Sequence, residues 1–342
     1  MEERHFWVGT YTGAMGGGQG VYRLRRGPDG ALERPEPAAV TTSPSYLAVH
    51  PGGGVLYAVN ERAEGAVVAY AVDGGRGLRE IGVRPVPAGP CHLTVTPGGG
   101  LLLAASYDAG AVSAVRLGPD GAFTGDPSVY QGHGRGPRAD RQEGPHAHAT
   151  AVAPDGTVLA ADLGADVVRA YRIAADGGAL EPVSEIRLPA GCGPRHLVVH
   201  PGGPVHVLTE LAGTVITLRP GSGHADLRIT AEAPATAGPV PAGSQSAAIK
   251  LGADGRHLYT SMRGADVVTT HRILPGGAGT EPVDDVPSGG EWPRDLHVDG
   301  EWLHVANQYS GLVAAFRIGA DGVPVPAGPP VEVPSPACIV PA

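Results

Sequence analysis

The feature that most constrains the fold is a phrase that occurs six times along the chain. Each copy reads as a strand of alternating apolar residues, a short turn that is usually rich in glycine, and a second strand. The copies are SYLAVHPGGGVLYAVNE, CHLTVTPGGGLLLAASY, HATAVAPDGTVLAADL, RHLVVHPGGPVHVLTE, AAIKLGADGRHLYTSMR and RDLHVDGEWLHVANQ, and they begin at Ser45, Cys91, His148, Arg195, Ala247 and Arg294. The starting points are therefore 46, 57, 47, 52 and 47 residues apart. A strand-rich period of about 40 to 50 residues is typical of β-propellers, in which each repeat forms one four-stranded blade.

Two further strands follow these hairpins. Alternating runs such as AVVAYAV (66–72) and DVVTTHRI (266–273) predict third strands, and more polar runs such as EPVSEIRLPAG (181–191) predict outer fourth strands. The chain ends supply a seventh blade, because HFWVGTY and GVYRLRR near the N-terminus resemble second and third strands, whereas the C-terminal SPACIVPA resembles a first strand. We therefore predict an all-β fold: a seven-bladed β-propeller of four-stranded antiparallel blades, with residues 1–342 as a single domain. Closing the ring between the N- and C-terminal strands removes exposed strand edges.

Composition and charge narrow the function classes. The 54 glycines and 34 prolines fit a protein rich in turns, because 42% hydrophobic residues in regular short runs argue against disorder. A net charge of −9 with few aromatic residues leads us to expect no nucleic-acid or membrane partner and a monomer. The three cysteines, Cys91, Cys192 and Cys338, have no metal-ligand spacing, and the sequence begins without an apolar signal core. We therefore expect a cytoplasmic location.

One rim of the predicted propeller collects polar side chains. The first strand of a blade starts at the rim where the second strand ends, so both ends share a mouth of the central channel. The second strands end at Glu61, Tyr107, Leu163, Glu210, Arg263 and Gln308, opposite the six starting residues named above. The longest interval adds the segment QGHGRGPRADRQEGP (131–145), whose Arg135, Arg138 and Arg141 lie close to the same mouth. Histidines, glutamates and arginines thus converge, as they do in a ligand site covered by a loop.

Simpler interpretations remain open for several of these residues. Arg195 and Glu210 face each other in one hairpin, so they also fit a structural ion pair. His146 and His148 share one face of an extended strand at a spacing that metals use, but only the distant Glu210 offers a third ligand. We therefore expect no metal and no other cofactor. The glycine-rich GAMGGGQG (13–20) is expected to form a hairpin loop, since no strand-to-helix context makes it a phosphate cradle.

The phrases RQEGPHAHA, GPRHLVVHPGG leading to LTEL, SMRGADVV and WPRDLHVDG leading to VANQYSG together resemble the seven-bladed lactonase propeller family. This family contains the cycloisomerase-type 6-phosphogluconolactonases and the fungal carboxy-muconate cyclases. The resemblance spans nearly the whole chain and implies hydrolysis of 6-phosphogluconolactone to 6-phosphogluconate in the pentose phosphate pathway. It places the family's site residues on His148, Arg195, Glu210 and Arg263. Met262 departs from the family pattern, which usually has asparagine before that arginine.

The chemistry of lactone hydrolysis agrees with these residues. It needs a base to take a proton from water and a positive field for the oxyanion that forms. We assign the base or proton shuttle to His148, with Glu210 as its orienting partner or as an alternative base. Arg195 and Arg263 hold the oxyanion and an anionic substituent of a small lactone substrate, while His146, Arg294 and Gln308 bind the substrate.

Two alternatives are kept. The same mouth could cyclise or open a carboxy-muconate-type lactone, with arginines holding its carboxylates. A non-enzymatic propeller that binds another protein is the other alternative, although such surfaces are usually richer in aromatic residues than this chain, at 5%.

Overall fold

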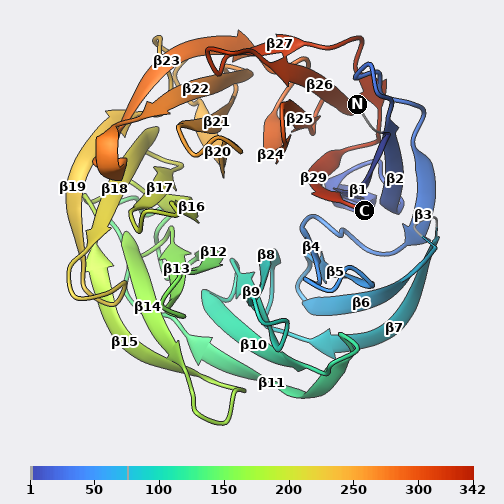
Figure 1. The fold of residues 1–342 in the computed structure, drawn as a ribbon. Coiled ribbons are helices and arrows are strands. Elements are labelled where there is room, and N and C mark those ends of the chain that lie inside the picture. The colour runs from blue at the N-terminus through green and yellow to red at the C-terminus, as the bar shows by residue number, and fades with distance from the viewer. Residues whose placement is uncertain (1–2, 75–76) are drawn as a thin grey trace.

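The computed structural model describes residues 3–74 and 77–342, which form seven antiparallel sheets arranged in a ring (Figure 1). Residues 1–2 and 75–76 of the predicted span 1–342 lie outside this part. The seven-bladed all-β propeller expected from the repeats is confirmed. Among the described residues, no helix is long and apolar enough to cross a membrane.

The blades follow one another around the ring, each from its inner to its outer strand. Blade 1 contains β4 (Leu47–Val49), β5 (Val55–Asn60), β6 (Ala66–Asp73) and β7 (Gly77–Pro85). Blade 2 contains β8 (Pro90–Val95), β9 (Leu101–Ser106), β10 (Ala111–Leu117) and β11 (Phe123–Gln131). Blade 3 contains β12 (Ala147–Val152), β13 (Val158–Asp162), β14 (Val167–Ile173) and β15 (Leu180–Arg187). Blade 4 contains β16 (Pro194–Val199), β17 (Val205–Thr209), β18 (Thr214–Pro220) and β19 (Leu227–Pro234).

The remaining blades complete the ring. Blade 5 contains β20 (Gln245–Leu251), β21 (His257–Arg263), β22 (Val267–Ile273) and β23 (Thr280–Pro287). Blade 6 contains β24 (Pro293–Asp299), β25 (Trp302–Asn307), β26 (Leu312–Ile318) and β27 (Pro324–Pro326), with the short β28 (Val331–Glu332) also paired to β26. Blade 7 contains β29 (Pro336–Pro341), β1 (Arg4–Thr10), β2 (Gly20–Arg26) and β3 (Glu36–Val40).

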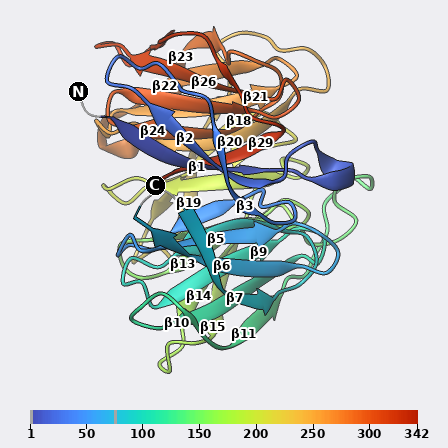
Figure 2. The same cartoon turned by 90° about the vertical axis from the view of Figure 1, so that its right-hand side faces the viewer.

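Blade 7 closes the ring as predicted, because the C-terminal β29 pairs antiparallel with β1. The first strand, β1, and the last strand, β29, are therefore neighbours in one blade (Figures 1 and 2). The glycine-rich segment 13–20 lies in the loop between β1 and β2 and ends at Gly20, the first residue of β2, which confirms the predicted hairpin loop. It contains one 3₁₀ turn (η1, Gly13–Met15). A second 3₁₀ turn (η2, Pro275–Gly277) joins β22 to β23.

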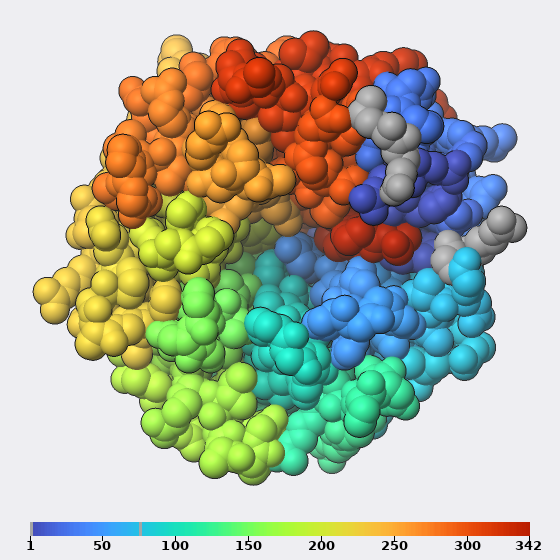
Figure 3. Space-filling model, viewed as in Figure 1, coloured from blue at the N-terminus to red at the C-terminus, as the bar shows by residue number. Residues whose placement is uncertain are grey.

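The hydrophobic core is divided among the seven interfaces between neighbouring blades. Each of the seven clusters of buried apolar side chains draws its members from two adjacent blades. Between blades 1 and 2, for example, Tyr57 and Val67 pack against Leu93 and Leu102. The inner strands surround the centre of the ring and line a channel, and the space-filling view is hollowed there (Figure 3).

The histidine of the recurring HPGG turn forms a hydrogen bond to the next blade. In His50 the ring Nδ1 accepts a hydrogen bond from the backbone N–H of Gly52 (3.0 Å). The proton therefore sits on Nε2, which donates to the carbonyl of Gly99 in the following blade (3.1 Å). His200 repeats the arrangement, with Gly255 as the acceptor (3.1 Å). These two histidines are therefore structural.

Seven other histidines are held neutral by the fold. Burial is the main cause, and it lowers the pKa of His92 to about 3 and those of His206, His271 and His297 to about 4. The pKa values of His148, His196 and His304 lie well below 6.5 for the same reason. In the unfolded chain these side chains take up a proton near pH 6.5, so the folded state is at a growing disadvantage as the pH falls below that value.

We predict that stability is highest above pH 6.5 and falls as the pH drops toward 5. Each histidine that stays neutral lowers the free energy of unfolding by up to about 1.4 kcal/mol per pH unit below about 6.5. Urea unfolding at pH 7.5, 6.5 and 5.5 measures the slope. His206→Gln should flatten it, whereas His133→Gln should not, because the His133 side chain is 67% exposed. An unchanged free energy of unfolding between pH 7.5 and 5.5 would contradict the prediction.

Candidate active site

Strand register brings the predicted mouth residues to one rim of the channel. Pro194 pairs with Thr209, Gln245 with Arg263, and Pro293 with Asn307, so the start of each inner strand lies beside the end of its neighbour. The side chains of His148, Arg195, Glu210 and Arg263 are in direct contact there, and Arg294 and Gln308 contact each other on the same rim. The roles assigned to these residues from the sequence stay predictions.

Glu210, which follows β17, is the centre of an ion cluster formed with three arginines. Its Oε2 lies 2.5 Å from Arg195 Nη1 and 2.9 Å from Arg263 Nη2, and its Oε1 lies 2.5 Å from Arg141 Nη2. The Glu210 side chain is 2% exposed. Burial disfavours its charged form, but the charges of Arg263 and Arg195 outweigh burial and hold the pKa of Glu210 well below its ordinary value. Glu210 is therefore a permanent carboxylate with both oxygens engaged.

Arg195 links this cluster to His148 across two blades. Its Nη1 lies 2.6 Å from Nε2 of His148, and its Nε donates to the carbonyl of Ala247 (2.8 Å). A guanidinium group only donates hydrogen bonds, so Nε2 of His148 is the acceptor and the imidazole carries its proton on Nδ1. Burial and the charge of Arg195 together keep the pKa of His148 well below 6.5. The lone pair of this imidazole is thus already used by Arg195.

His146 lies at the same rim with different partners. It precedes β12, and a bulge between Ala147 and Ala149 interrupts the regular alternation of that strand. The His146 ring stacks on Tyr107 at 4.3 Å, donates from Nδ1 to the Tyr107 carbonyl (2.9 Å), and lies 3.1 Å from Glu143. Within residues 3–74 and 77–342, no three His, Cys, Asp or Glu side chains are grouped so that they could hold a metal ion.

A second group of polar side chains lies at the same mouth. Arg294 lies over the Tyr11 ring (4.7 Å) and contacts Oε1 of Gln308 (3.3 Å). In the part of the chain that the structure describes, no carboxylate lies within 4.0 Å of Arg294. Tyr11 donates to Oε2 of Glu61 (2.8 Å), and Ser45 donates to the same oxygen. Arg294 is therefore a cation with no direct counter-ion.

Two contributors to the site were not recognised from the sequence. Arg141 was counted only as a loop arginine near the mouth, yet it completes the Glu210 cluster. Trp292 has φ +65°, a backbone conformation that non-glycine residues rarely adopt. In this position its ring lies 5.4 Å from the Arg263 guanidinium and stacks on Tyr309 (4.6 Å). Aromatic residues are rare in this chain, so a tryptophan two residues before Arg294 was the sequence feature that could have identified Trp292 as part of the site.

Met262, the departure from the family pattern, is on the opposite side of its strand from the ion cluster. It packs with Leu208, Val215 and Ile249 between blades 4 and 5. Arg263, the next residue, faces the channel and donates to the carbonyl of Ser246 (2.9 Å). The substitution therefore affects the interface between blades, and Arg263 is held by backbone carbonyls and Glu210.

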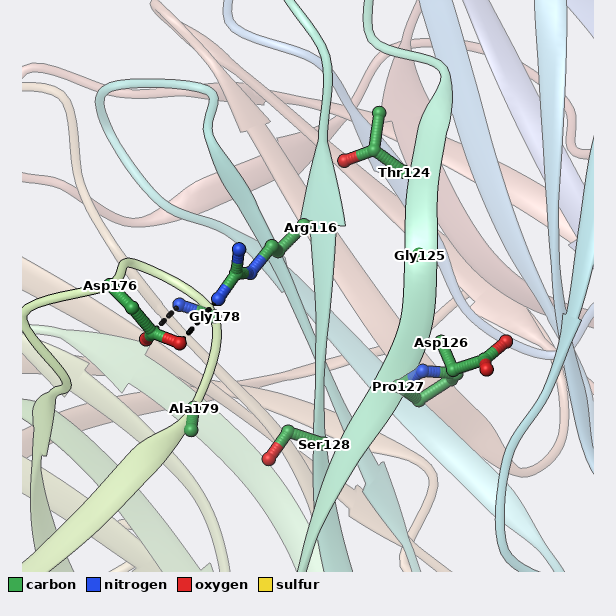
Figure 4. A pocket seen from close by; sticks show the side chains of 9 residues that line it. All are labelled: Arg116, Thr124, Gly125, Asp126, Pro127, Ser128, Asp176, Gly178 and Ala179. Atoms are coloured by element: carbon green, nitrogen blue, oxygen red, sulfur yellow. Dashed lines mark hydrogen bonds and ion pairs between the residues drawn. The ribbon is translucent and has the colours of Figure 1, made fainter.

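One hollow of the surface lies elsewhere, between the outer strands of blades 2 and 3 (Figure 4). It measures about 440 Å³ and contains one exposed ion pair, Arg116 with Asp176 (2.5 Å). Asp176 also accepts a hydrogen bond from the backbone of Gly178 (3.0 Å). This hollow has no buried titratable side chain, so the channel mouth is the better candidate for catalysis.

Known proteins share both the sequence pattern and the fold. A sequence model of the family described as "Lactonase, 7-bladed beta-propeller" matches residues 5–341. The chain is similar to the 6-phosphogluconolactonase of Bacillus subtilis (strain 168), with 31% identity over 97% of each chain. It is also similar to the 6-phosphogluconolactonase of Cronobacter sakazakii, with 30% identity over 87% of this chain and 86% of that protein. The structure of the periplasmic gluconolactonase of Pseudomonas aeruginosa superposes with a TM-score of 0.90, 27% identity and 99% coverage of both chains.

We predict that removing the charge of Glu210 destabilises the protein more than removing one of its partners. Glu210→Gln leaves Arg195 and Arg263 buried without a counter-ion and should lower the free energy of unfolding by about 3–5 kcal/mol. Arg141→Gln should cost less, because the Arg141 side chain is 29% exposed and two arginines remain beside Glu210. Urea unfolding at pH 7.5 compares the two. Equal and small losses in both variants would contradict a cluster centred on Glu210.

Proposed function

Because the chain belongs to the seven-bladed β-propeller lactonase family, we propose that it hydrolyses 6-phosphogluconolactone to 6-phosphogluconate at the channel mouth. Family membership makes the protein a lactonase, an enzyme that opens a cyclic ester. The phosphorylated sugar lactone is the proposed part. It would place the enzyme in the pentose phosphate pathway.

The observation that carries the proposed substrate is a local surplus of positive charge in an acidic protein. Glu210 is surrounded by three guanidinium groups, which leaves a net charge of +2 in that cluster, since +3 and −1 are combined there. Arg294 adds a cation without a direct carboxylate partner, while the whole chain carries −9. A site of this kind favours a substrate that brings negative charge with it, such as a phosphate ester.

The same cations suit the reaction itself. Attack of water on a lactone carbonyl turns the carbonyl oxygen into an oxyanion, which preorganised guanidinium donors stabilise in a site of low dielectric. We assign this task to Arg195 and Arg263. We assign contact with the anionic part of the substrate to Arg294, which Gln308 contacts. We assign contact with the sugar to His146, whose ring stacks on Tyr107.

The sequence offered His148 and Glu210 as candidates for the general base, but their contacts favour a role in positioning Arg195. Both oxygens of Glu210 accept from arginines, and Nε2 of His148 accepts from Arg195. Each would have to release a guanidinium group before taking a proton from water. We propose that both act as positioning residues, which hold the Arg195 guanidinium at the mouth.

A cytoplasmic location is part of the proposal. All three cysteines are unpaired and buried, which fits a reducing compartment. The similar Pseudomonas aeruginosa protein is a periplasmic gluconolactonase by its own description. Fractionation of the native host, with the protein detected by antibody, decides between the two compartments.

The test is the rate of acid release from 6-phosphogluconolactone, with spontaneous hydrolysis subtracted. We expect kcat/KM to be at least about tenfold higher for the phosphorylated lactone than for gluconolactone or a carboxylated muconolactone, since one added charged contact contributes roughly 1.4 kcal/mol or more. The rate should survive a chelator. Preference for gluconolactone or muconolactone would overturn the proposed substrate and leave the lactonase assignment in place.

A further inference from the structure

Glu61 is a carboxylate at the mouth that the proposed function has not used. It directly follows β5, and only its Oε2 is engaged, by the hydroxyl groups of Tyr11 (2.8 Å) and Ser45. Oε1 has no hydrogen-bond partner in the described parts of the chain, and no arginine or lysine lies within 4.0 Å of either oxygen there. The two hydroxyl donors fix the orientation of the carboxylate and leave one oxygen available.

Glu61 lines a small closed-in space in the channel together with two arginines. The residues around this space are Tyr11, Ser45, Tyr46, Glu61, Cys91, Arg195, His196, Arg294, Asp295 and Ala337. The centre of a water-sized sphere can move within about 10 Å³ of this cavity. A polar cavity needs roughly that much to hold one water molecule. The space therefore has the size of a single water molecule, and a carboxylate acceptor and two guanidinium donors are among the groups that line it.

The two arginines that line this space, Arg195 and Arg294, have N–H groups that no other described residue accepts. Arg195 directs Nη1 to Glu210 and His148 and Nε to the Ala247 carbonyl, which leaves Nη2 without a partner among the described residues. Arg294 makes one 3.3 Å contact with Gln308. Both cations can donate to an oxygen atom that sits beside Glu61.

Three other groups of the same cavity are poorly suited to take a proton from water. Burial raises the pKa of the Cys91 thiol well above its ordinary value, so it stays protonated. Burial likewise raises the pKa of Tyr11. Asp295 lies 3.2 Å from the ammonium group of Lys250 and accepts from the backbone N–H of Ile339, so it is already paired.

We propose that Glu61 is the general base of the lactonase reaction and that the one-water space beside it holds the nucleophile. The water oxygen forms a bond to the lactone carbonyl carbon, its proton passes to Oε1 of Glu61, and the carbonyl electron pair moves to the oxygen that faces Arg195. Collapse of this oxyanion breaks the bond to the ring oxygen, which takes the proton back from Glu61. The product is the open hydroxy acid, which ionises and releases one proton to solvent.

This assignment rests on the proposed function for its substrate, but it is tested on any lactone that the enzyme opens. Glu61→Gln keeps an oxygen that accepts from Tyr11 and Ser45, so the variant should fold and melt within a few degrees of the parent. Glu64→Gln is the matched control, because Glu64 is exposed in the turn after Glu61 and makes the same change of charge. Glu61→Ala opens space for a small carboxylate.

We expect Glu61→Gln to lower kcat by about 100-fold or more, as loss of a general base does, with KM changed less than about threefold. Glu64→Gln should retain the parental rate. Added formate should restore part of the activity of Glu61→Ala and none of that of His148→Ala. A structural role for Glu61 would not produce rescue by formate.

Several results would overturn the assignment. A Glu61→Gln enzyme with more than about a third of the parental kcat would do so, as would rescue of His148→Ala by formate or imidazole while Glu61→Ala stays inactive. If Glu61→Gln fails to fold, the Glu61→Asp variant decides, since a retained carboxylate should keep most of the rate. Activity on gluconolactone alone would overturn the proposed substrate, and the same variants would then judge Glu61 on that lactone.

Discussion

Apolar contact between neighbouring blades is the interaction on which the rest of this structure depends. A four-stranded sheet of this kind buries its two faces only when another blade covers each of them, and the seven apolar clusters supply that cover in a closed circle. The pairing of β29 with β1 completes the circle. Because the core is spread around the ring, the centre is left to the inner strands, and polar side chains can meet there without disturbing the packing.

The charged side chains of the site come from several blades. Glu210 and Arg195 belong to blade 4, Arg263 belongs to blade 5, and Arg141 comes from the segment that leads into blade 3. Burying the guanidinium groups of Arg195 and Arg263 at the mouth would be costly without a carboxylate between them. Glu210 therefore makes the cationic site possible. Because both of its oxygens are engaged by arginines, we propose another carboxylate, Glu61, for proton transfer.

The fold could be predicted almost completely from the sequence, because a repeat places strands by counting alone. Counting also placed Ser45 beside Glu61 and Arg195 beside Glu210, since both ends of a hairpin share one rim. Contacts between blades could not be predicted in this way. Nothing in the local pattern shows that Arg141 reaches Glu210 or that Nε2 of His148 accepts from Arg195, because these pairs are 69 and 47 residues apart. The bulge in β12 likewise gives His146 and His148 different partners, which strict alternation does not predict.

We propose that the lactone carbonyl binds against the Arg195 guanidinium in the mouth of the channel. A crystal structure of the protein with 6-phosphogluconate tests it most directly, since the carboxylate of this product contains the former carbonyl carbon. We expect this carboxylate to lie within hydrogen-bond distance of Arg195, with the phosphate toward the arginines of the mouth. Product bound at the other end of the channel, or in the hollow beside Arg116, would contradict it.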